Sequence, residues 1–124
     1  NMRIAATLAG FALLVCAVAH AETVTVPLKH AMVEHDKQAG QDLVNVVLTT
    51  EGQRRITMFT RDRVGRKLYL RLDGTLLTAP TLMSPIEGNA LQLSPGLTGF
   101  GNMSAQAIAT RLNERGAVEV SDEK

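Results

Sequence analysis

Residues 67–79 read KLYLRLDGTLLTA, and this stretch decides how the chain folds. In its first half, leucine alternates with Tyr69 and Arg71, a period of two that is typical of a half-buried β-strand. Asp73-Gly74 comes next, and an Asp-Gly pair favours a two-residue hairpin because both positions need positive φ. The run TLLTA supplies a second arm, so we predict an antiparallel hairpin here.

The segment before this hairpin has the pattern of an amphipathic helix. Thr49 or Thr50 can accept a hydrogen bond from the first helical amides, and Glu51 lies at the positive end of the helix dipole. Four side chains at helical spacing form an apolar stripe, with arginines on the opposite face; they are Ile56, Phe59, Thr60 and Val64. Gly65 can take the left-handed conformation that ends a helix.

Two further strands are expected before this helix. Residues 23–33 (TVTVPLKHAMV) alternate at their start, but Pro27 cannot donate a ladder hydrogen bond. We therefore predict an edge strand, or a strand with a break at this residue. Residues 35–42 are polar and indicate a turn, and residues 43–49 (LVNVVLT) are β-branched and apolar, which favours a buried strand.

The chain after the hairpin predicts a short strand, a loop and a second helix. Pro80 is expected to end the ladder pairing, and residues 90–93 to form the short strand. Residues 94–102 (SPGLTGFGN) hold three glycines and a proline, which is typical of a loop. The second helix is expected to start with Ser104 as its N-cap and to end at Gly116.

Residues 117–120 are expected to add a last strand, and residues 121–124 a polar tail that frays. The order of elements is then β-β-α-β-β-β-α-β, with short connections. This order predicts an α+β fold in which two helices pack on one face of a mostly antiparallel sheet.

Residues 1–21 have the pattern of a cleavable signal peptide. A short positive start leads into an uncharged, mostly apolar run that ends at Ala19, and Ala19 and Ala21 are the small residues of a cleavage site before Glu22. The run has about 16 residues, fewer than the roughly 20 that a bilayer-spanning helix needs. We therefore predict a signal peptide followed by a periplasmic or secreted domain over residues 22–124. A retained membrane anchor is the alternative.

The charge of the chain is balanced, with 13 lysines and arginines against 12 acidic residues. Such a balance argues against a general nucleic-acid binder. Basic residues do gather between Glu51 and Asp73, which is typical of a solvated helix face; contact with anionic lipid or with an acidic partner is the alternative. The single cysteine, Cys16, lies in the signal region, so we expect neither a disulfide nor a thiol nucleophile in the mature part.

No motif for catalysis, metal binding or cofactor binding stands out in the sequence. His30 and His35 are five residues apart, so neither a strand nor a helix brings them to one face. There is no Gly-x-Ser-x-Gly elbow, and the glycines of residues 96–101 lack the Lys-Ser/Thr of a phosphate loop. We therefore predict a domain that is not an enzyme and needs no cofactor, metal or small-molecule substrate.

A series of short motifs follows in a specific order along residues 43–116. A helix starts with an acidic residue and glycine and contains a threonine, and a glycine and a basic residue follow it: Glu51-Gly52, Thr60 and Gly65-Arg66. A strand then ends in Asp-Gly, and an Ala-Pro pair and an Ile-x-Gly step come after it: Leu72-Asp73-Gly74, Ala79-Pro80 and Ile86-Glu87-Gly88. In this order, and with the helix AQAIATRL after them, the chain resembles the head region in the first periplasmic domain of SecD, a membrane subunit that assists the Sec translocon.

The resemblance implies an α+β domain that moves relative to a base and contacts polypeptide emerging from the translocon. The proton-driven work of that family lies in its membrane part and is not carried over. The motif residues themselves have architectural explanations. Gly52 and Gly88 would permit tight turns, Gly65 would cap a helix, and Asp73-Gly74 would set the register of the hairpin.

The favoured hypothesis is a binding module with a protein or polypeptide partner in the cell envelope. Its contact surface would be an apolar patch at Leu97 and Phe100, or an exposed sheet edge marked by Pro27. The alternative for the two apolar residues is that they fold back and cover the core. Rival functions are a structural or regulatory subunit of an envelope complex, and a peripheral protein that contacts the membrane through the basic face of residues 54–71.

Overall fold

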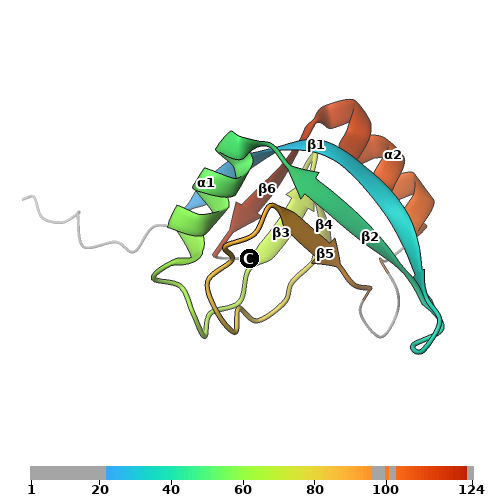
Figure 1. Cartoon of the computed structure of the whole chain (residues 1–124), viewed down its shortest axis with the longest axis horizontal. Helices are drawn as coiled ribbons and strands as arrows, with labels where there is room; N and C mark the ends of the chain where they lie inside the picture. The colour runs from blue at the N-terminus through green and yellow to red at the C-terminus, as the bar shows by residue number, and fades with distance from the viewer. Residues whose placement is uncertain (1–21, 96–99, 101–102, 123–124) are drawn as a thin grey trace, which may run out of the picture.

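The computed structural model describes residues 22–95, Phe100 and residues 103–122 (Figure 1). These residues form strands and helices in the order β1 (Thr23–Asp36), β2 (Gln41–Leu48), α1 (Thr50–Thr60), β3 (Tyr69–Leu72), β4 (Thr75–Thr78), β5 (Ala90–Leu93), α2 (Ala105–Arg115) and β6 (Ala117–Ser121). The predicted α+β class and the predicted order of elements are both confirmed.

The strands of the described chain form one sheet in the order β4-β3-β6-β1-β2-β5, in which every neighbouring pair is antiparallel. The edge strands are therefore β4 and β5. The sheet curls until these two edges approach each other (Figure 1). A hydrogen bond joins them: the hydroxyl of Thr78 at the end of β4 donates to the carbonyl of Ser94, just beyond β5, at 3.3 Å.

The longest strand, β1, lies inside the sheet, so the prediction of an edge strand at Pro27 is wrong. Its first part pairs with β6 as far as the partners Pro27 and Ala117, and its second part pairs with β2, with a register shift between Leu28 and His30. The missing amide of Pro27 thus falls where β1 changes its partner. This position corresponds to the break that was the alternative interpretation.

The connection between β1 and β2 is shorter than the predicted turn of residues 35–42. Strand pairing continues to Asp36 and Gln41, so the turn proper covers only residues 37–40. The carboxylate of Asp36 accepts hydrogen bonds from the amides of Gln38 and Ala39, and Gly40 has a φ of 68°. Local polar contacts therefore close a tight turn between two long strands.

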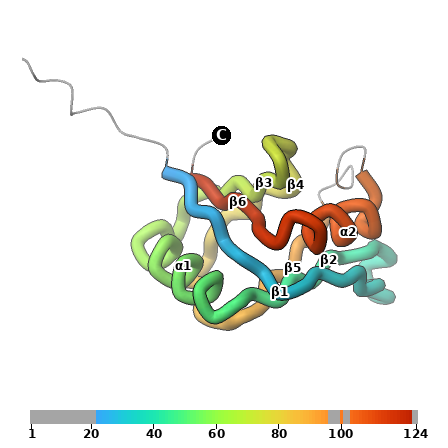
Figure 2. The backbone as a smooth tube through the Cα atoms, turned by 90° about the horizontal axis from the view of Figure 1, so that it is seen from above, coloured from blue at the N-terminus to red at the C-terminus, as the bar shows by residue number. Residues whose placement is uncertain are grey.

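Both helices begin with the predicted hydroxyl caps and pack on β1 and β2, as Figure 2 shows from above. The side chain of Thr49 accepts a 2.9 Å hydrogen bond from the amide of Gly52, and that of Ser104 accepts one of 3.0 Å from Ala107. Gly116 ends α2 with a φ of 74°, as predicted. The buried stripe of α2 is the predicted one as well: Ala105, Ile108, Ala109 and Leu112.

Helix α1 ends earlier than predicted. Its last residue is Thr60, and Arg61 at the C-cap keeps right-handed helical angles, so Gly65 does not cap it. Gly65 instead has a φ of 89° in the turn that leads to β3, where its amide donates a 2.7 Å hydrogen bond to the carbonyl of Leu82. Val64 is consequently exposed and does not belong to the buried stripe.

Gly52 lies inside the first turn of α1 and allows a close approach of the helix to β1, not the tight turn that was expected. A Cβ atom at this position would lie 2.1 Å from the carbonyl oxygen of Pro27, which is a backbone atom. The same carbonyl accepts hydrogen bonds from the amide and the hydroxyl of Thr49. The helix is thus docked on β1 at the point where that strand changes its partner.

The hairpin of β3 and β4 has the predicted turn. Asp73 and Gly74 have φ values of 51° and 81°, and Leu72 and Thr75 pair directly on either side of them. Pairing does not end at Pro80, however, because the carbonyl of Pro80 accepts a 2.9 Å hydrogen bond from Leu68. A further bridge pairs Lys67 with Thr81, so the prediction that Pro80 ends the ladder is wrong.

Candidate functional site

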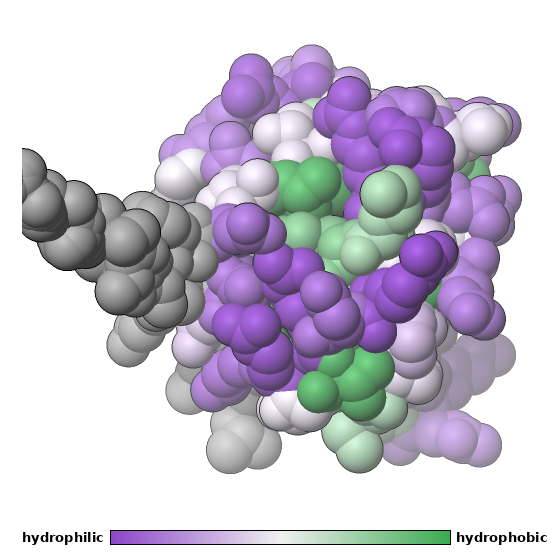
Figure 3. Space-filling model, turned by 90° about the vertical axis from the view of Figure 1, so that its left-hand side faces the viewer, coloured by the Kyte–Doolittle hydropathy of each residue, from purple (hydrophilic) through white to green (hydrophobic). Residues whose placement is uncertain are grey.

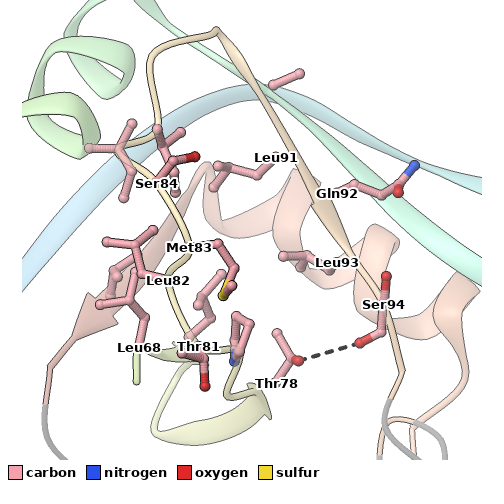
Figure 4. Close-up of a pocket in the computed structure, with 16 residues that line it drawn as sticks. Leu68, Thr78, Thr81, Leu82, Met83, Ser84, Leu91, Gln92, Leu93 and Ser94 are labelled. Carbon is pink, nitrogen blue, oxygen red and sulfur yellow. Dashed lines mark hydrogen bonds between the residues drawn. The ribbon is translucent and has the colours of Figure 1, made fainter. Parts of the chain in front are cut away.

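An apolar groove of about 370 Å³ lies between the two edges of the curled sheet (Figure 4). The groove's floor is formed by apolar side chains from α1, from β3 and the residue before it, and from β6: Ile56, Leu68, Leu70 and Val120. One wall is the segment from Thr78 to Ser84, and the other is the segment from Ala90 to Ser94. Among the described residues that line the groove, none carries an ionisable side chain, so this lining fits an uncharged, apolar ligand.

Met83 is the most exposed apolar residue at this site. Met83 is 81% exposed although it lines the groove, and Figure 4 shows its side chain on the wall opposite Leu91 and Leu93. Methionine is flexible and polarizable, so it adapts to differently shaped apolar partners. An exposed methionine over an apolar floor is therefore suited to contact side chains of varied shape.

One end of the groove is held by hydrogen bonds from α1. The buried hydroxyl of Thr60 donates to the carbonyl of Ile56 at 2.7 Å and accepts from the amide of Ile86 at 3.0 Å. The hydroxyl of Thr57 donates to the carbonyl of Ile86 at 2.8 Å, and the side-chain amide of Gln53 donates to the carbonyl of Glu87 at 3.0 Å. Three side chains of one helix thus fix the segment in which Ile86 lines the groove.

The motif residues are divided between the groove and the structure behind it. Pro80 and Ile86 line the groove, whereas Thr60 and Gly52 position α1 and the segment after Met83. The turn residues Gly65 and Asp73-Gly74 set the shape of the chain on either side of β3. Ala79 is half-buried beside Pro80, and Gly88 is exposed, with nothing within 4 Å of the position that a Cβ atom would take.

Of the two predicted contact residues, Leu97 and Phe100, only Phe100 is among the described residues. Phe100 is 8% exposed and belongs to the core, bridging to Met103, which corresponds to the alternative that it covers the core. Leu97 lies outside the described residues, as do Ala19 and Ala21 of the expected cleavage site. The sequence did not predict that the segment after Pro80 lines a groove, because the irregular stretch between Pro80 and Pro85 has no hydrophobic periodicity.

A second polar site, which we call the Asp122 cluster, consists of Glu22, Arg63, Arg66 and Asp122. The Asp122 side chain is only 3% exposed, and its carboxylate contacts Nε of Arg63 at 2.9 Å and Nη2 of Arg66 at 3.1 Å. The backbone amide of Glu22 donates to the same carboxylate at 3.1 Å, and the Glu22 side chain pairs with Arg63. The expectation that residues 121–124 form a fraying tail is therefore wrong for Ser121 and Asp122, which are both buried.

Opposing effects act on the ionisation of Asp122. Burial favours the neutral acid, but the hydrogen bonds from Arg63 and from the amide of Glu22, with the charge of Arg66, outweigh it and lower the pKa of Asp122 below its ordinary value. Arg63 also donates to the carbonyl of Phe59 and stacks on its ring, 4.0 Å from the centroid. The cluster ties the start of β1 and the end of β6 to the segment after α1.

Several arginines of residues 54–71 are engaged within the molecule. Arg54 and Arg55 both bond to Glu51 and lower its pKa to about 2. Arg71 donates to the hydroxyl of Ser121 at 2.8 Å, and Arg63 belongs to the Asp122 cluster. Figure 3 shows the end of the molecule at which α1 lies as largely hydrophilic, with smaller apolar areas between. Four of these basic residues, Arg54, Arg55, Arg63 and Arg66, thus form ion pairs within the molecule.

The described part of the chain contains neither a candidate metal site nor a candidate membrane-spanning helix. No group of three histidine, cysteine or carboxylate side chains comes close enough together to hold a metal ion there. Within the same residues, no helix has the length and apolar character needed to cross a bilayer. His35 pairs with Asp42 at 2.8 Å on the surface, away from His30.

Comparison with known proteins identifies relatives that share this domain. The SecD subunit of the protein translocase from Dictyoglomus turgidum is 39% identical over 59 residues, which are 48% of this chain and 14% of the relative. That from Sebaldella termitidis is 33% identical over 94 residues, covering 76% of this chain and 22% of the relative. The chain thus spans less than a quarter of the length of these relatives.

Two solved structures have a similar fold. The first is described as that of a membrane component SecDF that enhances protein export; it is 30% identical with a TM-score of 0.59 over 70% of this chain and 38% of the other. The second, SecDF in a super-membrane-facing form, is 29% identical with a TM-score of 0.55 over 68% of this chain and 11% of the other. The model of the SecDF P1 head subdomain matches residues 17–120, most of the sequence. The chain therefore belongs to the SecDF P1 head family, and the resemblance to the SecD head region is confirmed.

Proposed function

We propose that this chain acts in protein export by binding unfolded polypeptide in the groove between β4 and β5. The observation that carries the proposal is an uncharged, apolar groove, with exposed Met83 at its mouth, in a domain of the SecDF P1 head family. Unfolded chains expose apolar side chains that folded proteins bury, and removing such surface from water is favourable by roughly 25 cal/mol per Å². The groove provides that burial without a charge that would select one particular sequence.

The proposed place of action is the periplasm, with residues 1–21 removed as a signal peptide. Cleavage before Glu22 would turn the amide of this residue into an ammonium group. That nitrogen lies 3.1 Å from the buried carboxylate of Asp122, so the new positive charge would join the Asp122 cluster. The Asp122 cluster is thus compatible with a mature chain that begins at Glu22.

Binding to an unfolded protein tests the proposal directly. Fluorescently labelled β-casein, which lacks a stable fold, is titrated with the purified chain, and the fluorescence anisotropy is recorded. We expect Met83→Glu to weaken binding by about tenfold or more, because it adds a charge at the mouth of an uncharged groove. The matched control is Met32→Glu, since Met32 is also an exposed methionine, 49% exposed, but lies on β1 and does not line the groove.

Two outcomes would contradict the proposal. The first is no binding of β-casein by the unmodified chain at micromolar concentration. The second is an equal loss of affinity in Met83→Glu and Met32→Glu, which would assign the binding to general surface hydrophobicity. Circular dichroism of both variants confirms that each remains folded before the titrations are compared.

A further inference from the structure

The wall of the groove that follows β4 directs some of its backbone groups away from β3. The amide of Leu68 donates to the carbonyl of Pro80 at 2.9 Å, and the amide of Leu82 donates to the carbonyl of Arg66 at 2.8 Å. These two bonds bracket the bridge between Lys67 and Thr81. Backbone groups alternate in direction along a strand, so the amide and carbonyl of Thr81 point away from β3 and towards the groove.

The opposite wall, β5, has the same arrangement. The amide of Leu48 donates to the carbonyl of Asn89 at 2.7 Å, which sets the alternation for the pairs that follow along β2 and β5. The backbone groups of Leu91 and Leu93 are then directed to β2, and those of Ala90 and Gln92 to the groove. The groove therefore lies between the two sheet edges (Figure 4). By the alternation along each edge, the backbone groups of Thr81 on one side and of Ala90 and Gln92 on the other are directed to it.

The topology limits how this gap can be filled. Five antiparallel steps separate β4 from β5, so the two edges run in opposite directions. A strand placed between them is antiparallel to one edge and parallel to the other, and both kinds of pairing are stable. The sheet would then close around its apolar floor, and neither edge would remain open.

The lining of the groove defines the side chains of such a strand. Alternate residues of an added strand point to one face, so every second side chain would meet the floor formed by Leu68, Leu70 and Val120. Because the described lining residues include no ionisable group, we expect those side chains to be apolar and uncharged, and the intervening ones to face solvent. The uncharged lining and the direction of the backbone groups thus both favour an extended polypeptide segment as the ligand.

We propose that the groove takes one extended segment of a polypeptide as an added strand, which pairs with the segment after β4 on one side and with β5 on the other. The segment has apolar, uncharged side chains at alternate positions. This inference rests on the proposed function, since it specifies how polypeptide would bind in the same groove. Recognition through the backbone would accept many sequences, because every residue other than proline offers the same amide and carbonyl.

Backbone-modified peptides test the pairing. The probe is a capped peptide of about seven residues in which valine and threonine alternate. Two versions carry N-methyl groups on every second amide, one on the odd and one on the even positions, so that each removes the donors directed at one edge. We expect each version to bind about tenfold or more weakly than the unmodified peptide, because several hydrogen bonds are lost in each.

Amide exchange measured by NMR provides a second readout on the protein. Binding of the unmodified peptide should slow the exchange of the Thr81 and Gln92 amides. The Leu82 amide is the internal control, because it already donates to Arg66 within the sheet and should change little. Slowed exchange at all three amides to the same degree would indicate general stabilisation and would overturn the pairing.

The remaining outcomes separate this inference from the proposed function. Equal binding of all three peptides, or binding of β-casein but of no peptide, would overturn strand pairing and leave binding in the groove intact. Weakening by only one set of N-methyl groups would overturn pairing with both edges. Failure of both β-casein and the peptides to bind would overturn the proposed function itself.

Discussion

The Asp122 cluster and the groove are built in opposite ways. In the cluster, a carboxylate that is 3% exposed contacts two arginines and a backbone amide, so its hydrogen-bonding capacity is used within the chain. In the groove, the lining is uncharged, the floor is apolar, and the edges of the sheet face an opening. The Asp122 cluster joins parts of the chain that are far apart in sequence, whereas the groove is an opening between two edges of the sheet.

Helix α1 connects these two sites. Thr60 at its end holds Ile86 beside the groove, and three residues later Arg63 enters the Asp122 cluster. Gly52 at its start seats the same helix on β1. Helix α1 therefore attaches both to β1 and to the segment with Ile86 beside the open site, while the chain just after it belongs to the closed site.

The docking of α1 through Gly52 should have the largest effect. In Gly52→Ala, the new Cβ atom would lie 2.1 Å from the Pro27 carbonyl oxygen, so the helix or β1 must shift. We expect a loss of about 3 kcal/mol in the free energy of unfolding, at the upper end of the usual range for overpacking. Urea denaturation followed by circular dichroism measures it.

The matched control is Gly88→Ala. Gly88 is also a motif glycine, but it has no positive φ, and nothing lies within 4 Å of its Cβ position. We expect a change of no more than about 0.5 kcal/mol, because a surface substitution without a clash is usually small. Similar losses in both variants would refute the close-approach explanation for Gly52.

The hydroxyl of Thr60 should have the next largest effect. Thr60→Val keeps the shape of the side chain but removes the acceptor for the Ile86 amide and leaves that amide without its partner. We expect a loss of about 2 kcal/mol, within the range for a buried polar group left unsatisfied. Thr60→Ser retains the hydroxyl, so its free energy of unfolding should fall by less. A larger loss in Thr60→Ser than in Thr60→Val would show that packing, not hydrogen bonding, determines the contribution of this residue.

Local signals in the sequence predicted the elements well. The Asp-Gly turn, the caps at Thr49 and Ser104, and the glycine that ends α2 all depend on residues within a few positions of one another. Such short-range signals act on the backbone wherever it lies in the fold. For this reason, the class and the order of the elements follow from the sequence alone.

The errors concern contacts between residues far apart in the chain. Pro27 was assigned to an edge because the sequence does not reveal that β1 changes partner there, and Pro80 was assigned to the end of a ladder for a similar reason. Asp122 was assigned to a tail, since its partner Arg63 lies 59 residues away. The groove depends on the curl of the whole sheet, so no local pattern could predict it.

Asp122→Asn should have the smallest of the three effects at neutral pH, and its effect should depend on pH. Asparagine has the size of aspartate and can still accept from the Glu22 amide, but it removes the charge that faces Arg63 and Arg66. Arg63 keeps its contacts with Glu22 and with the Phe59 carbonyl. We therefore expect a loss of about 1.5 kcal/mol near pH 7, measured by urea denaturation.

The pH dependence distinguishes a charge effect from a packing effect. The pKa of Asp122 is lower in the folded chain than its ordinary value of 3.8, so its ionised form favours folding. This contribution is fully present above the ordinary pKa and is lost as the pH falls through the lower, folded pKa. The difference between the two proteins should thus be constant above about pH 5 and shrink below about pH 4. Glu51 also has a lowered pKa, about 2, but it is present in both proteins and cancels in the difference. A difference that stays constant down to pH 2 would mean that Asp122 stabilises the chain by its shape, and the contrast between a charged, closed site and an uncharged, open one would lose its energetic basis.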